Sequence, residues 1–68
     1  MTFKVYAAFQ NQFNETIEEK EEATYEWPQA FGAFTIYAAD PDCVQCTVTY
    51  KDSRNLTRLA LVYNEVKE

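Results

Sequence analysis

The chain has no histidine, a single glycine and two prolines among its 68 residues. Without histidine it lacks the side chain that most often acts as a general base or a metal ligand near neutral pH. Because Gly32 is the only glycine, no glycine-rich loop can hold a phosphate group. No catalytic motif is recognisable among the remaining residues, so we expect a protein that is not an enzyme.

Basic residues are also few, with six against eleven acids and a net charge of −5. The whole excess lies between Glu15 and Glu26, where six glutamates stand against one lysine, Lys20. Nucleic-acid binding needs cations that neutralise phosphates, so direct binding to nucleic acid is disfavoured. A basic protein surface is the better electrostatic match for this segment.

Long apolar runs are missing as well. No run approaches the roughly 20 residues that a membrane-spanning helix needs. The first residues also lack the basic and apolar regions of a signal peptide. We therefore expect a cytoplasmic protein with no membrane contact and with both cysteines reduced.

The composition nevertheless favours a folded chain, because 47% of the residues are hydrophobic and 16% are aromatic. A chain of this length forms one domain, here residues 1–68, and the charged residues 64–68 are expected to form a frayed tail. So small a domain buries a modest core, and a homodimer could bury further aromatic surface.

The segment Pro28–Ala39 is predicted to be the single helix. Pro28 suits a first helical turn, and Asp40 before Pro41 ends the helix. The predicted core-facing stripe recurs at spacings of three and four: Trp27, Ala30, Phe31, Phe34, Tyr37 and Ala38. The opposite side, with Gln29, Ala33 and Ile36, is small and apolar and is left free for contact.

Alternating apolar residues predict strands over 2–10, 43–50 and 56–63. The segment 16–25 is less regular. Thr16 and Glu19 fit a helix capping box, but a helix here would place like charges four residues apart and would lack an apolar stripe. We favour a strand paired to the first one. The prediction is an α+β domain of β-β-α-β-β order, with one helix packed on one face of a four-stranded antiparallel sheet.

Two surfaces are candidate binding sites. The first is an acidic patch formed by Glu18, Glu19, Glu21 and Glu22. A charge run is most often only a solvated surface, and charged edges also suppress aggregation. The second is the sheet face away from the helix, where Tyr6 and Val62 are predicted to lie with Ala60 in an apolar patch. Thr47 and Thr49 are predicted to lie between them, and the alternative interpretation is an ordinary threonine-rich exposed face.

The spacing Cys43–Val44–Gln45–Cys46 is typical of redox pairs and half zinc sites. On a regular strand, residues three apart point to opposite faces, so we expect the two sulfurs to diverge. We favour Cys46 as a small core residue and Cys43 at the end of the strand, and we expect no cofactor and no bound metal.

The leading hypothesis is a small acidic, non-enzymatic protein-binding domain. One specific form is an inhibitor, encoded by a phage or mobile element, of a host protein with a basic surface. The first alternative is a homo-oligomeric structural or assembly protein joined through the open sheet face or an edge strand. The second is a metal or redox protein that uses Cys43 and Cys46.

Overall fold

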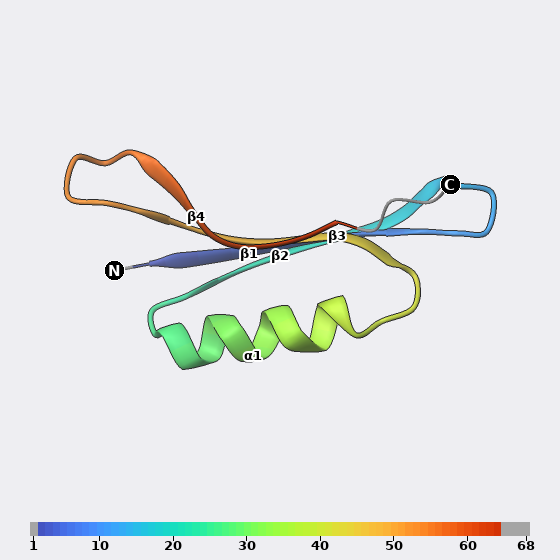
Figure 1. Ribbon diagram of the computed structural model, residues 1–68, viewed down its shortest axis with the longest axis horizontal. Coiled ribbons are helices and arrows are strands. Elements are labelled where there is room, and N and C mark those ends of the chain that lie inside the picture. The colour runs from blue at the N-terminus through green and yellow to red at the C-terminus, as the bar shows by residue number, and fades with distance from the viewer. Residues whose placement is uncertain (1, 65–68) are drawn as a thin grey trace.

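The computed structural model describes residues 2–64 and shows a sheet with one helix on one of its faces (Figure 1). The elements follow the order β1 (Phe3–Gln10), β2 (Thr16–Thr24), α1 (Trp27–Ala38), β3 (Cys43–Lys51) and β4 (Thr57–Asn64). The predicted α+β fold is therefore confirmed, including a strand rather than a helix after Thr16. Of the predicted tail, Asn64 ends β4, and residues 65–68 lie outside the described residues.

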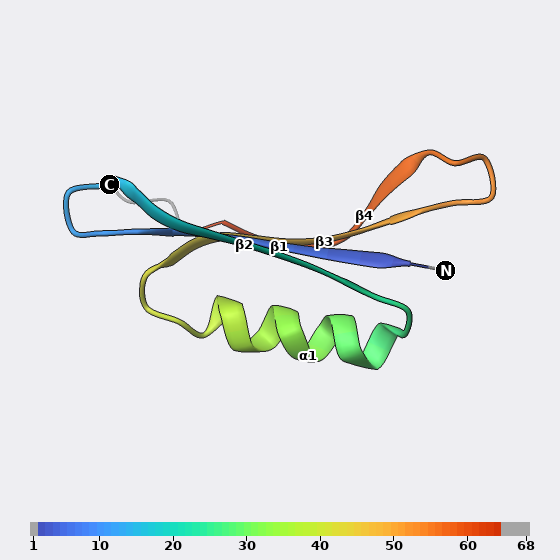
Figure 2. The ribbon, with the colours of Figure 1, turned by 180° about the vertical axis from the view of Figure 1, so that it is seen from behind.

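All strand pairs are antiparallel, and the spatial order is β2-β1-β3-β4. β1 and β3 are thus central, while β2 and β4 are the two edges. The view from behind shows α1 lying along one side of the sheet, with the β3–β4 hairpin curving away from it (Figure 2). One face of the sheet is covered by the helix, and we call the other the open face.

Asparagine takes the place that glycine often has in tight turns at the two hairpins. Asn14 and Asn55 adopt left-handed backbone conformations, with φ values of 62° and 63°. Asparagine tolerates this region better than most other side chains. Asp52 Oδ1 accepts two backbone N–H groups across the second hairpin, and Asn11 Oδ1 accepts two across the first. Tight turns therefore form without glycine.

The buried core lies between α1 and the central strands and consists mainly of small side chains: Val5, Ala7, Phe9, Ala30, Cys43, Cys46 and Val48. Phe34 and Tyr37 pack against it, as predicted. Ala33 also packs against it, although the sequence placed that residue on the free side. The helix is thus rotated slightly from the predicted orientation, with Ala30 completely buried against the sheet.

The prediction that Trp27 and Phe31 belong to the core is wrong, because they are 40% and 50% exposed. The close approach of the helix at Ala30 moves both rings to the rim. There the Trp27 ring makes an edge contact with Phe3 at a centroid distance of 5.5 Å, and the Phe31 ring contacts Trp27 at 6.1 Å. Each aromatic contact of this kind adds about 0.5–1.5 kcal/mol beyond area burial.

Candidate functional site

β2 is an edge strand that is exposed from Thr16 to Ala23. The register places Glu18 and Glu22 opposite the core residues Phe9 and Val5, so these two carboxylates lie on the helix side of the sheet. Glu19 and Glu21 stand opposite Ala8 and Tyr6 and lie on the open face. The structure therefore divides the predicted acidic patch between two faces. We call these four glutamates the acidic edge.

Every glutamate of the acidic edge has a partner within the chain. The contacts are Glu18–Lys20 at 3.7 Å, Glu21–Lys4 at 3.5 Å, and hydroxyl-to-carboxylate hydrogen bonds Tyr6–Glu19 at 2.7 Å and Tyr37–Glu22 at 2.5 Å. The ion-paired side chains are about half exposed (45–59%). Exposed ion pairs contribute only about 0–1 kcal/mol each. A protein partner could therefore take over the carboxylates of Glu18 and Glu21 at little cost.

Tyr37 joins the acidic edge to the helix. Its hydroxyl donates to Glu22 Oε2, and this bond, followed by burial, raises the pKa of Tyr37 to about 12 from its ordinary value of 10.0. Lys20 Nζ lies 5.7 Å from the centroid of the Tyr37 ring and 5.5 Å from that of Phe9. The ammonium group thus covers the side of the core with a cation–π contact on each ring.

We expect the chain to lose stability in alkali. The raised pKa of Tyr37 means that the folded state holds this proton more tightly than the unfolded state. Its contribution is complete below pH 10 and is lost as the pH rises through about 12. Urea denaturation of Tyr37→Phe should show a smaller decline in midpoint above pH 10, with Tyr25→Phe, at an exposed position, as the control. Equal declines in both variants would contradict this role for the Tyr37–Glu22 bond.

The open face carries the second pair of predicted binding residues. Tyr6, Thr47 and Val62 form one row across three strands, so Tyr6 and Val62 share this face as predicted. The Tyr6 hydroxyl donates to Glu19, which raises the pKa of Tyr6. The two predicted sites therefore adjoin at the Tyr6–Glu19 bond, a contact that sequence spacing does not reveal.

The prediction that Ala60 lies on the open face is wrong. Thr49 faces Leu59 and Val48 faces Leu61, so a β-bulge leaves Ala60 between two paired residues. Ala60 packs against the core, while Leu59 lies on the open face and is 59% exposed. The exposed apolar part of the open face therefore includes Leu59 and Val62, with Tyr6 beside them.

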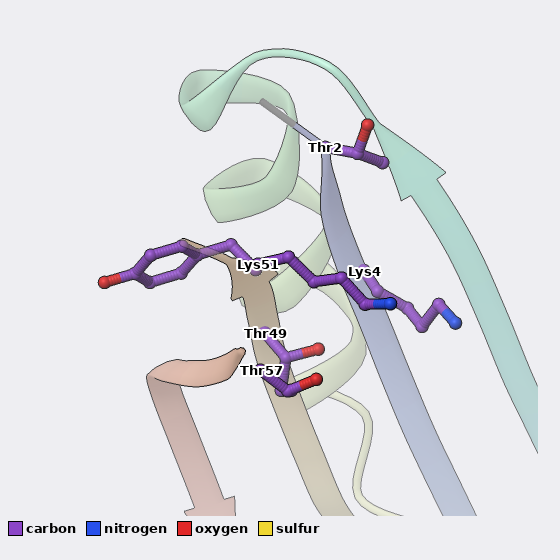
Figure 3. Close-up of a pocket in the computed structure, with 6 residues that line it drawn as sticks. Thr2, Lys4, Thr49, Lys51 and Thr57 are labelled. Carbon is purple, nitrogen blue, oxygen red and sulfur yellow. The ribbon is translucent and has the colours of Figure 1, made fainter. Parts of the chain in front are cut away.

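A basic pocket of about 430 Å³, which sequence reasoning missed, opens on the sheet near the start of β1. Lys4 faces Thr49 across β1 and β3, and Lys51 faces Thr57 across β3 and β4. The two lysine side chains extend in the same direction, and the side chains of Thr49 and Thr57 lie beside that of Lys51 (Figure 3). The lysines are far apart in the sequence, and only the strand register brings them together.

The prediction that the two cysteine sulfurs diverge is wrong. Phe9 faces Cys43 while Ala8 faces Gln45, so a β-bulge at Val44 changes the alternation of side chains. Both cysteines are consequently completely buried in the same core. The predictions that Cys46 is a core residue and that Cys43 lies at the end of the strand are confirmed, but Cys43 also belongs to the core. Burial, and then the neighbouring Cys43, raise the pKa of the Cys46 thiol to about 11. A protonated, buried thiol is a poor nucleophile and metal ligand.

No group of three or more histidine, cysteine, aspartate or glutamate side chains within residues 2–64 is arranged to hold a metal ion. Within the same part of the chain, no helix is long and apolar enough to cross a membrane. No protein-family model, curated protein or solved structure matches the chain. Its function must therefore be argued from the acidic edge and the open face.

Proposed function

We propose that the chain is a small non-enzymatic binding protein whose acidic edge docks on a basic surface of another protein. The observation that carries this proposal is the exposure of β2 from Thr16 to Ala23 within the segment that holds the whole excess negative charge. The specific form that small size and net charge support is a cytoplasmic inhibitor of a host protein, encoded by a phage or mobile element.

An edge strand offers two means of attachment at once. Its outer backbone groups can pair with a strand of the partner, and its side chains splay to both faces of the sheet. Carboxylates on both faces of β2 would therefore meet lysines or arginines on either side of a pairing strand. Opposite charges also accelerate the encounter of two proteins, and this effect weakens as salt is added.

Three double charge reversals test the proposal with the same change in net charge. They are Glu18→Lys/Glu22→Lys on the helix side, Glu19→Lys/Glu21→Lys on the open face, and Glu15→Lys/Glu26→Lys beyond the ends of β2 as the control. We expect both edge variants to lose a partner that the wild-type chain and the control retain in pull-downs quantified by mass spectrometry. The reversal of all four edge glutamates should abolish its capture.

The salt dependence provides a second check on the same partner. Capture by the wild-type chain should fall steeply as ionic strength rises, because the charges involved are exposed and easily screened. Capture that is unchanged by the fourfold reversal, or that is insensitive to salt, would remove the proposal.

The apolar part of the open face favours a second candidate, a homo-oligomeric assembly protein. Leu59 and Val62 are both more than half exposed and lie on neighbouring rows of the same face. Light scattering over a range of concentrations should then show a mass that rises with concentration in the wild type and not in Leu59→Lys/Val62→Lys. A single monomeric mass throughout would exclude this candidate.

A further inference from the structure

We propose that the groove between α1 and β2 binds a lysine or arginine side chain of the protein partner, a step that rests on the proposed function. The groove has a volume of about 380 Å³, and it is lined by Glu22 from β2 and by Gln29, Gly32, Ala33, Ile36 and Tyr37 from α1. It contains the side of the helix that was predicted to be free for contact, with Glu22 of the acidic edge across from it.

Gly32 forms an open part of this groove. It lies in the interior of α1, where glycine costs roughly 0.5–1 kcal/mol relative to alanine. Its backbone is not in the left-handed region, and a Cβ atom built on it would have no neighbour within 4 Å. The fold therefore does not require glycine here. The missing side chain instead leaves space at the centre of the helix surface that faces the groove.

The lining combines an apolar wall with one charged end. Ala33 and Ile36 supply aliphatic surface, and Ile36 is 72% exposed. Glu22 supplies a carboxylate whose position is fixed by the Tyr37 hydroxyl. A lysine or arginine has the matching form, because its aliphatic stem can lie on apolar surface while its charged head reaches a carboxylate.

The charges around the groove favour a cation over other occupants. Lys20 is the one basic residue of β2, and its ammonium lies 5.7 Å from the centroid of the Tyr37 ring, but it pairs with Glu18. No ion pair reaches Glu22 within residues 2–64. No basic side chain lines the groove, so an anion would find no counter-charge. A purely apolar side chain would remove water from Glu22 without replacing it, which is unfavourable.

The test is a nuclear magnetic resonance titration of the ¹⁵N-labelled full chain. Because the chain has one glycine, the Gly32 amide signal can be assigned without ambiguity. The probe is N-acetyl-arginine amide, and the control ligand is the citrulline analogue, which has a similar shape and no charge. We expect a saturable shift of the Gly32 signal with the arginine probe and no saturable shift with citrulline.

Two variants with the same change of charge separate the groove from the rest of the acidic edge. Glu22→Gln should weaken arginine binding roughly tenfold, because it removes the carboxylate that meets the cation. Glu19→Gln, on the other face of β2, should leave binding unchanged. Gly32→Leu should fold, since its side chain enters open space. Because this variant has no glycine signal, its titration is followed at the amide of Ala33, another lining residue, which should shift saturably in the wild type and not in the variant.

Equal shifts with arginine and citrulline, or equal weakening by Glu22→Gln and Glu19→Gln, would overturn the inference. If the groove fails in this way while the edge reversals still abolish partner capture, only the inference falls and the proposed function stands. If the groove binds arginine but the edge reversals leave capture unchanged, the proposed function falls.

Discussion

Phe9→Ala is expected to leave the chain largely unfolded at room temperature. Phe9 is only 4% exposed, lies in the central strand β1, and makes an edge contact with the Tyr37 ring at a centroid distance of 6.4 Å. Truncating a buried phenylalanine costs about 3–5 kcal/mol. A single core in a chain of this size rarely supplies more than about 3–5 kcal/mol in total. The expected decrease in the free energy of unfolding is therefore comparable to the total stability of the chain.

Phe13→Ala is the matched control, because it makes the same chemical change in the hairpin that follows β1. Phe13 is 70% exposed, so its truncation should change the free energy of unfolding by no more than about 0.5 kcal/mol. Circular dichroism and urea denaturation would compare the two variants. A well-folded Phe9→Ala with a near-normal midpoint would show that the core is not centred on β1.

The fold could be predicted because alternation and helical spacing reflect burial directly. Phe3, Val5, Ala7 and Phe9 share the helix side of β1, as their positions in the sequence predict. Pro28 and the pair Asp40–Pro41 place the helix within one residue of its observed bounds. The strand at β2 was also recoverable, because repulsion between glutamates four apart disfavours the helical alternative.

The β-bulges explain the errors at Cys43 and Ala60. One extra residue reverses the alternation of side chains between the two faces beyond it. The residue types near Val44 and Ala60 do not indicate this change. The groove and the basic pocket needed further information, namely strand order, register and the rotation of α1. A prediction of which residues share a face is therefore reliable only as far as the next bulge.

Replacing Glu18, Glu19, Glu21 and Glu22 by threonine is expected to turn a chain with a protected edge into one that self-associates. Threonine favours strands, so β2 should still form. Its outer backbone groups would then be exposed without the charges that keep a second strand away. The net charge would also fall from −5 by four units to −1, which further favours association.

The control is the variant Glu15→Gln/Glu26→Gln/Asp40→Asn/Asp42→Asn. It changes the net charge by the same four units and leaves the sequence of β2 unchanged. Light scattering should show concentration-dependent assembly of the threonine variant, whereas the control should scatter as the wild type does. Assembly of both variants to the same extent would assign the effect to net charge and contradict edge protection.

Edge protection and partner binding make different demands on the same four carboxylates. Protection needs charge of either sign, because two positively charged edges repel one another as two negative ones do. Binding to a basic surface needs negative charge alone. The fourfold change to lysine should therefore resist self-association as the wild type does and yet lose its partner, while the threonine variant should fail in both respects. A lysine variant that neither assembles nor loses capture would leave edge protection as the sole role of the acidic edge.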